Sequence, residues 1–238
     1  MNARLYRAAP HRVRLRAVSV AAVLLAGMAF AAPGARAEGR SYPALFGSDE
    51  RMFAGAAAFP KWSEMLERLA RHEAIRVKPC RWEQGINVCE VGKWTAFVDT
   101  QRGRPLRDML DAVNAYMNAY PYVLDLATWG VEDYWETPQE HVSYGGDCED
   151  YAIAKFMTLR KLGVPAADLR VVVLNDLNLN VQHAVLAVYT ADGAYILDNQ
   201  AAQVQRAERI VHYQPIYSVT EGSWWLHVPG PQTQVARR

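Results

Sequence analysis

The sequence predicts an α+β domain, because its helix-forming and strand-forming segments occupy separate parts of the chain. Apolar residues recur at helical spacing at residues 60–72, 105–120 and 148–162. After residue 165 the apolar period changes to two, and several alternating segments follow one another between polar turns. Helices followed by consecutive antiparallel strands are typical of the α+β class.

Residues 1–37 are expected to be a cleavable signal peptide and not part of the fold. A basic start precedes an apolar run at residues 17–32, which is short for a membrane span, and the sequence ARA before Glu38 offers small residues where signal peptidase reads. A retained membrane anchor is the alternative, and the short run fits it less well. We therefore expect a domain of residues 38–238.

The expected mature chain is mildly acidic, which limits its partners. The full chain has 26 basic and 25 acidic residues, and residues 1–37 hold six of the arginines and no acid, so the net charge of the remainder is about −5. No basic run remains to bind nucleic acid. No later stretch is apolar enough to cross a bilayer. We expect a soluble, exported protein with no nucleic-acid partner and no membrane insertion.

The first two helices are predicted from apolar stripes. The helix at 60–72 has Pro60 in its first turn, a position that favours proline. The helix at 105–120 carries a similar stripe, and Asp111 and Asn114 are expected to face away from it. Both stripes are interpreted as core contacts.

The remaining elements follow in order along the chain. Segments 87–94 and 96–100 are expected to be strands, and the aromatic-rich segment 121–146 a loop. The helix at 148–162 is expected to end at Gly163. The strands expected after this helix are 169–175, 181–190, 194–200 and 216–228.

Two of the three cysteines suggest a disulfide. Cys80 and Cys89 bracket a short segment with Gly85 near its middle, as in a hairpin. In an oxidising compartment these two cysteines are expected to pair, which leaves Cys148 without a partner. A zinc site is a weak alternative, because the sequence has no CxxC or HxxxH spacing.

The motif GGDCEDYA places Cys148 in the first turn of a helix. Asp147 is a favoured N-cap residue, and Asp150 completes an approximate capping box. Acidic neighbours raise a thiol's pKa, but a helix N-terminus stabilises a thiolate, and the Cys148 N–H could donate to an oxyanion. Gly145 and Gly146 would let a substrate backbone approach. Cys148 is therefore a candidate nucleophile, with a buried capping-turn cysteine as the alternative.

His183 and Asp198 are the candidate partners of that thiol. His183 begins an apolar strand, and His141 is its rival as a base. If residues 190–193 form a four-residue hairpin loop, His183 and Asp198 are diagonal neighbours on one face of the sheet. A tighter turn would separate them further. The carboxylate would then orient the imidazole.

These motifs together resemble the bacterial transglutaminase-like cysteine proteinases. Three stretches occur in the same order as in the family: GGDCEDYAIAK, QHAVLAV and YILDNQ. The upstream stretch YWETPQEHVSYGGDCED also resembles the family's sequences. The resemblance covers most of residues 38–238. It implies a papain/transglutaminase-like fold in which the nucleophile helix packs on an antiparallel sheet. It also implies that Cys148 attacks, His183 acts as base and then acid, and Asp198 orients the imidazole.

The resemblance carries further expectations about cofactor, place and partners. It implies a periplasmic protease that cuts a large surface adhesin near its N-terminus, and an inner-membrane cyclic-di-GMP receptor that sequesters the protease and so controls biofilm attachment. It implies calcium bound by Asp147, Glu149 and Asp150. Spacing alone favours a capping role for these residues, since three carboxylates are few ligands and no EF-hand pattern is present.

Two other classes of function remain open. The same fold and residues could serve a transglutaminase or a hydrolase of peptidoglycan peptides. A catalytically inactive periplasmic binding module is the other alternative, although Cys148, His183 and Asp198 are all present. Trp129 and Trp135 could line a cleft or pack in the core, and neither is assigned to the site.

Overall fold

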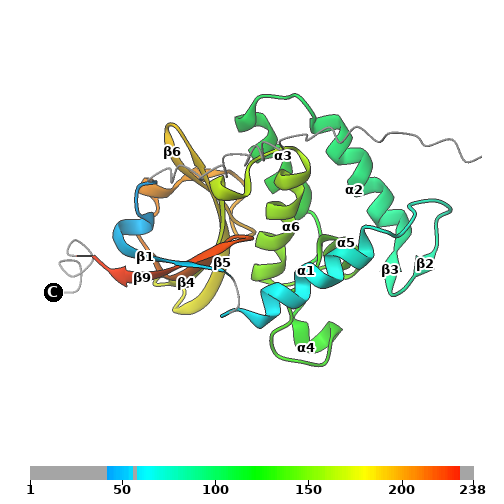
Figure 1. Ribbon diagram of the computed structural model, residues 1–238, viewed down its shortest axis with the longest axis horizontal. Helices are drawn as coiled ribbons and strands as arrows, with labels where there is room; N and C mark the ends of the chain where they lie inside the picture. The colour runs from blue at the N-terminus through cyan, green and yellow to red at the C-terminus, as the bar shows by residue number, and fades with distance from the viewer. Residues whose placement is uncertain (1–41, 56–57, 231–238) are drawn as a thin grey trace, which may run out of the picture. The chain divides into compact units, whose positions relative to one another are not determined.

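Helices pack on one face of an antiparallel sheet in the computed structural model, which describes residues 42–55 and 58–230 (Figure 1). The main sheet has seven strands in the order β1-β9-β8-β4-β5-β6-β7, and all its pairings are antiparallel. Its strands are β1 (Ser48–Ala54), β4 (Leu169–Asp176), β5 (Val181–Thr190), β6 (Gly193–Leu197), β7 (Gln205–Arg206), β8 (Tyr213–Val219) and β9 (Ser223–Pro229).

The helices precede most of this sheet in the chain. They are α1 (Pro60–His72), α2 (Val88–Gln101), α3 (Leu106–Asn118), α4 (Asp125–Thr128), α5 (Pro138–Tyr144) and α6 (Cys148–Lys161). Short 3-10 turns are η1 (Leu45–Gly47), η2 (Ala166–Asp168) and η3 (Ala207–Arg209), and a two-stranded hairpin is formed by β2 (Trp82–Glu83) and β3 (Ile86–Asn87). The α+β class expected from the sequence is confirmed.

Helix α6 is the centre of the helical layer. It packs against β4 and β5 of the sheet and against α3 and α5 of the helical layer, as Figure 1 shows. One core cluster joins Ile153 and Phe156 of α6 to Leu110 of α3 and to Val171 and Leu186 of the sheet. The helix that starts at Cys148 is therefore held on the sheet along most of its length.

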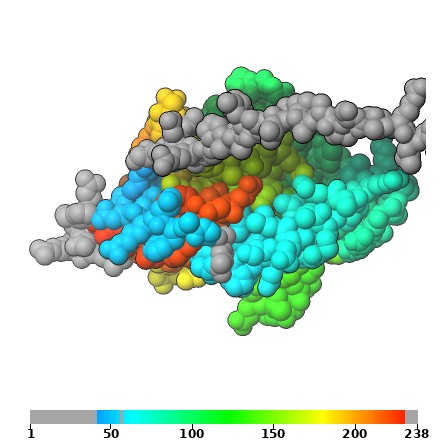
Figure 2. All heavy atoms as spheres, in the orientation of Figure 1, coloured from blue at the N-terminus to red at the C-terminus, as the bar shows by residue number. Residues whose placement is uncertain are grey.

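The opposite face of the sheet is also buried. Val172 and Val185 belong to a second core cluster, which is completed by Leu45 and residues of the segment before β8. Strands β1 and β9 lie side by side at the sheet edge, next to α1, on the face shown in Figure 2. Phe53 of β1 stacks on Trp224 of β9.

All three expected helices agree closely in extent with α1, α3 and α6, and one side-chain expectation is wrong. The helix expected at 60–72 is α1, and the one at 105–120 is α3. Asp111 is exposed and pairs with Arg107, as expected for an outward residue. Asn114 is instead fully buried, because its Nδ2 donates to the Ala201 carbonyl at 3.0 Å. A search for the apolar residues of a helix does not reveal a buried amide that donates to the carbonyl of a loop.

The strands expected at 87–94 and 96–100 are wrong, because this stretch is helix α2. Its buried positions recur every three or four residues, which is the period of a helix, and the side chain of Asn87 accepts the Cys89 N–H at 3.1 Å as an N-cap. Its valines and threonines favour strands in general. Burial of one stripe against α5 and α6 outweighs that preference.

The segment expected to be a loop, 121–146, contains α4 and α5. Helix α5 begins with a capping box in which the Thr137 hydroxyl accepts the Glu140 N–H at 3.2 Å and the Glu140 carboxylate accepts the Thr137 N–H at 2.7 Å. Pro138 occupies the first turn. This start signal is present in the sequence, and the short length of the helix conceals it.

The remaining strands and the disulfide agree with expectation. Three of the expected strands match β4, β5 and β6, and the fourth, 216–228, is divided between β8 and β9 by a turn. Strand β1 was not expected. Cys80 and Cys89 form a disulfide that joins the β2–β3 hairpin region to α2. The proposed signal peptide lies outside the described residues, and within those residues no helix is long and apolar enough to cross a membrane.

Candidate active site

Cys148 is the first residue of α6, and the chain before it is held by a neighbouring segment. The Val123 N–H donates to the Gly146 carbonyl at 3.0 Å, and the Gly146 N–H donates to the Pro121 carbonyl at 3.3 Å. Residues 121–123 therefore run alongside the turn that leads into the helix. This pairing fixes the direction from which the chain enters α6.

The two glycines before Cys148 are required by the chain's own packing. Gly145 has φ +80°, and a Cβ there would overlap the carbonyl oxygen of Pro121. A Cβ on Gly146 would lie 2.5 Å from Asp150 Oδ2 and 2.7 Å from Glu136 Oε2. The expectation that these glycines admit a substrate backbone is replaced by this finding: protein atoms fill the space beside them.

Asp150 fixes the first turn of α6 from inside. Its side chain is fully buried, its Oδ2 accepts the Asp147 N–H at 2.9 Å, and its Oδ1 accepts the Glu136 N–H at 2.8 Å. The first of these bonds is the Asp150 half of the expected capping box. Asp150 thus ties the start of α6 to the segment before α5.

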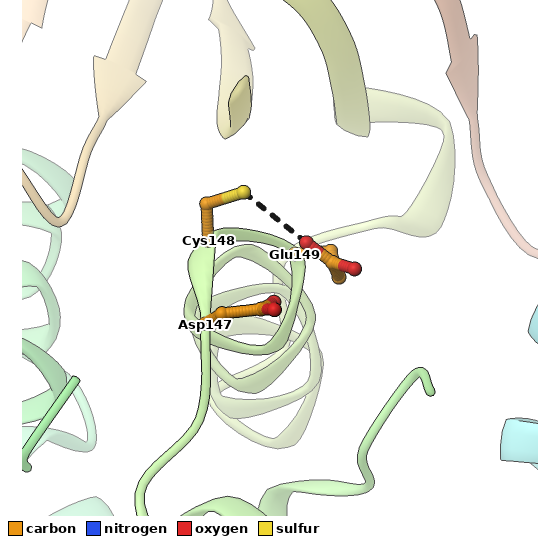
Figure 3. Close-up of side chains that lie close together, drawn as sticks. All are labelled: Asp147, Cys148 and Glu149. Carbon is orange, nitrogen blue, oxygen red and sulfur yellow. Dashed lines mark hydrogen bonds between the residues drawn. The ribbon is translucent and has the colours of Figure 1, made fainter. Parts of the chain in front are cut away.

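The Cys148 thiol donates a hydrogen bond to Glu149. Sγ lies 3.1 Å from Glu149 Oε2, on the same side of the first turn (Figure 3). Burial raises the pKa of Cys148, and the charge of Glu149 adds to this shift, while the backbone N–H of Ala184 opposes it. This shift favours a protonated thiol, and the thiol lies next to the backbone N–H of Ala184 on β5, the residue after His183.

His183 and Asp198 meet as the sequence analysis predicts. Tyr189 pairs with Ala194 across the β5–β6 hairpin, which is the expected register. His183 Nε2 lies 2.9 Å from Asp198 Oδ1, and both side chains are buried. This bond occupies Nε2, so Nδ1, which Gln200 Nε2 approaches only at 3.4 Å, is the ring nitrogen that remains for a reacting group.

Two residues not identified from the sequence complete the environment of Asp198. The Tyr213 hydroxyl donates to Oδ2 at 2.5 Å, and the Gln200 N–H donates to Oδ1 at 2.8 Å. Burial tends to raise the pKa of Asp198, but the hydrogen bond and charge of His183 and these two donors hold it below its ordinary value. The Gln200 side chain also lies near the pair, with Nε2 3.4 Å from His183 Nδ1. The sequence gives no signal for Tyr213, since its strand β8 is separated from β6 by two other strands of the sheet.

His141, the rival base, occupies a different environment. It is fully buried on α5, with its ring 4.5 Å from that of Tyr151. Burial, and then the charge of Lys155, lowers the pKa of His141 to about 3. A histidine in this position stays neutral inside the helical layer, whereas His183 lies beside the thiol-bearing turn.

An acidic cluster surrounds the start of α6. The expected metal ligands Asp147, Glu149 and Asp150 belong to it, and the α4 region adds Asp125 and Asp133, which sequence reasoning missed. Ligand atoms of Asp125, Asp147 and Asp150 lie within 4.8 Å of one another, as do those of Asp125, Asp133 and Glu149. The missed residues belong to an acid-rich segment, whose composition is the signal that could have found them.

The carboxyls of this cluster lack enough donors among the described residues. Asp147 Oδ1 and Asp125 Oδ1 are buried without a hydrogen-bond partner there. Burial, reinforced by Glu149, raises the pKa of Asp147 to about 8, and burial also raises the pKa of Asp125 to about 6. Closely spaced, buried carboxylate oxygens without donors are the ligands that a hard cation such as calcium prefers. The residues present therefore fit such an ion.

Comparison with known proteins places this geometry in a family. The family model for bacterial transglutaminase-like cysteine proteinases (BTLCP) matches residues 80–231. The chain belongs to the bacterial transglutaminase-like cysteine proteinases. It is therefore a cysteine protease of the transglutaminase-like type. No curated protein sequence matches the chain.

Solved structures of LapG from Legionella pneumophila are similar to this proteinase. The calcium-bound form is 30% identical, with a TM-score of 0.55, and the match covers 69% of this chain and 86% of that chain. A second LapG structure and an EGTA-treated one are each 31% identical, with a TM-score of 0.54, covering 68% of this chain and 84% of the other. The fold expected for the proteinase family is thus confirmed.

Proposed function

We propose that this proteinase is an endopeptidase in which Cys148 is the nucleophile, His183 the general base and acid, and Asp198 the residue that orients the imidazole. The observation that carries the proposal is the buried 2.9 Å bond between His183 Nε2 and Asp198, on the strand whose Ala184 N–H faces the Cys148 thiol. Acyl transfer by such an enzyme requires a nucleophile, a base that takes its proton and a carboxylate that orients the base.

The chemistry follows from which atoms each residue has free. His183 Nδ1 takes the thiol proton, and Sγ then attacks the scissile carbonyl carbon. As the first residue of α6, Cys148 has a backbone N–H with no acceptor within the helix, so this N–H is placed to donate to the oxyanion. The imidazolium gives its proton to the leaving amine. Water, deprotonated by the same imidazole, then hydrolyses the thioester and restores the thiol.

Calcium dependence is the second part of the proposal. The residues that would hold the ion are Asp125, Asp133, Asp147, Glu149 and Asp150. A bound dication would supply positive charge that offsets the negative field these carboxylates place on the Cys148 thiol. The similarity to LapG, which has been solved in a calcium-bound form, supports this assignment.

The substrate, place and partner proposed here rest on the likeness to LapG. We propose a periplasmic protease that cuts the N-terminal region of a large surface adhesin, releases it and thereby controls biofilm attachment. An inner-membrane cyclic-di-GMP receptor is proposed as its inhibitor. The expected signal peptide and the mildly acidic mature chain agree with an exported enzyme that acts on proteins.

Cleavage of an adhesin fragment tests the proposed function. Purified residues 38–238 should cut the N-terminal region of a repeat-containing adhesin at one site in calcium, and the Cys148→Ala and His183→Ala variants should not. His141→Ala is the matched control and should retain cleavage if it folds. Incorporation of a small primary amine in place of cleavage would identify a transglutaminase. A slow thiol-labelling rate in calcium, with no product, would identify an inactive binding module.

A further inference from the structure

Two amide side chains near the end of α3 donate to the loop that follows β6, and the reaction described above does not use them. Asn118 Nδ2 donates to the Asp198 carbonyl at 2.9 Å and to the Ala201 carbonyl at 3.2 Å. Asn114, one turn earlier, donates to the Ala201 carbonyl alone. All the acceptors are carbonyl oxygens, so only the NH2 end of each amide can face them. The loop after β6 is thus attached to α3 through side chains.

The backbone at Asp198 is held by these donors and not by the sheet. Strand β6 ends at Leu197, so the Asp198 carbonyl lies beyond the strand. The Gln200 N–H returns to Asp198 Oδ1 at 2.8 Å, and its position depends on the path of the chain from Asp198 to Ala201. The carbonyls at both ends of this path are the acceptors of Asn118. One amide therefore fixes the backbone of Asp198 and the position of a donor to its carboxylate.

The chain that follows Asn118 is attached to the start of α6. The Tyr151 hydroxyl, in the first turns of α6, donates to the Tyr120 carbonyl at 2.6 Å. The N–H of Gly146, in the turn before α6, donates to the Pro121 carbonyl at 3.3 Å. The end of α3 therefore contacts the helix start that carries the thiol and, through Asn118, the loop that carries the orienting carboxylate.

We propose that Asn118 is a positioning residue: its amide holds Asp198 in place relative to the start of α6 and so keeps this carboxylate bonded to His183. A carboxylate can orient a base only if its own position is fixed, and small displacements of such groups lower the rate. The 2.9 Å bond between His183 Nε2 and Asp198 Oδ1 is the contact that a shift of the loop would lengthen. This inference rests on the proposed roles of His183 and Asp198.

The kinetics of Asn118→Leu test the inference first, because leucine has a similar size and no donor. The variant should lower kcat about tenfold or more and leave KM within about twofold, since alignment of the base matters in the transition state. Cleavage of the adhesin fragment in calcium provides the measurement. An unchanged kcat in the folded variant would overturn the proposal.

Proton NMR in a Cys148→Ala background tests the bond itself without any peptidase activity. The imidazole proton that His183 donates to Asp198 should give a downfield resonance, as expected for a strong, charge-assisted hydrogen bond. Asn118→Leu should move this resonance upfield or broaden it through exchange with water. A resonance that is the same in both proteins would also overturn the proposal.

Asn114→Leu is the matched control. It removes a similar donor from the same helix and the same loop, but the Ala201 carbonyl keeps Asn118 as a donor and the Asp198 carbonyl is untouched. Each variant should lower the melting temperature by about 2–6 °C. Only Asn118→Leu should lower kcat and change the His183 resonance. Equal effects of the two variants on kcat and on the resonance would mean that general loop stability is the cause.

Two further measurements do not require Asn118→Leu to fold. Asn118→Asp keeps the shape of the side chain and replaces the donor by an acceptor, so it should show the same loss of kcat and the same change in the resonance. In the unaltered protein, the side-chain amide protons of Asn118 should exchange slowly with water, and fast exchange would contradict the proposed bonds. Failure of the proposed function would appear separately, as full cleavage by Cys148→Ala or Asp198→Asn.

Discussion

The Asp198 carboxylate is held through both of its oxygens. Oδ1 accepts from His183 and from the Gln200 N–H, and Oδ2 accepts from Tyr213. A carboxylate that accepts several hydrogen bonds is both ionised and fixed in orientation. Tyr213 lies on β8, which is separated from β6 by β4 and β5 in the sheet. The imidazole is therefore oriented by a residue from a distant part of the sheet.

Tyr213→Phe should weaken this arrangement without removing either member of the pair. Loss of the donor leaves Oδ2 of a buried carboxylate unpaired, and kcat/KM should fall about tenfold. The Tyr213 bond lowers the pKa of Asp198, so its removal should move the acid limb of the pH profile upward. Cleavage rates between pH 4 and 9 provide the measurement. Tyr189→Phe removes the hydroxyl of another buried tyrosine of the same core cluster, and it should leave the limb unchanged.

The β2–β3 hairpin is attached to the helical layer by a disulfide and by hydrogen bonds to α5. The Cys80–Cys89 disulfide joins its base to α2, and the Tyr144 hydroxyl of α5 donates to the Gly85 carbonyl at 2.6 Å. Gly85 and Gln84 both adopt positive φ at the turn. Because these attachments do not involve Cys148, His183 or Asp198, we expect the hairpin to support stability and not the chemistry.

Removal of the disulfide by Cys80→Ala with Cys89→Ala should lower the free energy of unfolding by about 2–3 kcal/mol, since a short loop is released in the unfolded chain. Urea denaturation measures this change, and cleavage activity should persist in the folded variant. Reduction of the unaltered protein should reproduce the shift, and the double variant should not respond to reductant. A free-thiol count of three in the oxidised protein would contradict the pairing.

Strand β1 is joined to the sheet through a buried histidine on β9. His227 Nδ1 lies 2.9 Å from Ser48 Oγ, and its Nε2 lies 2.9 Å from Ser218 Oγ. Arg170 Nη1 and Glu50 Oε2 form an ion pair at 2.6 Å beside it. Burial lowers the pKa of His227 to about 4. This shift favours a neutral imidazole at this edge of the sheet.

His227→Gln should make the protein less sensitive to acid. The histidine's pKa is lower in the folded state than its ordinary value of about 6.5, so its contribution to stability is present above that pH and is lost as the pH falls towards 4. The unaltered protein should lose about 2 kcal/mol more than the variant between pH 7 and 4.5. Urea titrations at both pH values measure the difference, and equal losses would contradict the prediction.

The sequence predicts those helices and strands whose apolar pattern extends over many residues. It also predicts contacts between residues that lie on the same face of the sheet. Helices α1 and α6 follow from apolar period and capping residues, and His183 meets Asp198 because hairpin register keeps both on one face. Helix α2 was misread, because its valines favour strands and only its burial against α5 and α6 shows the helical stripe. Local preference is decided there by tertiary packing.

Residues that enter the site from distant segments could not be predicted in the same way. Tyr213 reaches Asp198 across two intervening strands, and Asp125 reaches Asp147 through the fold of segment 121–146. Gly145 and Gly146 were assigned to a substrate, whereas the approach of Pro121 and Asp150 explains them. A single sequence shows that such residues are unusual, but it does not show which residues of other segments contact them in the fold.

The acidic cluster is the feature through which we expect calcium to act on the whole molecule. It joins the segment around α4 to the first turn of α6. Because several of its carboxyls are buried, an ion that binds only the folded state should stabilise the folded protein. Stability and activity should therefore respond to the same ion.

Calcium at about 100 times its dissociation constant should raise the melting temperature by about 5–10 °C, and a calcium-selective chelator should reverse this and lower activity. Magnesium should substitute poorly, since it demands tighter octahedral geometry and keeps its waters. Asp125→Asn should reduce the shift. Asp111→Asn, which alters an exposed acid of α3, should not. Full activity and an unchanged melting curve in chelator would contradict the calcium assignment.

The bond between Cys148 and Glu149 also bears on the rate at which oxidants react with the thiol of the resting enzyme. Thiolates, and not thiols, attack disulfides and peroxides, so a sulfur kept protonated by its neighbours reacts slowly with both. The residue is the one free cysteine of the described chain, and a mixed disulfide or sulfenic acid there would inactivate the enzyme. We therefore expect the Glu149 contact to slow oxidation of Cys148 as long as that carboxylate does not bind calcium.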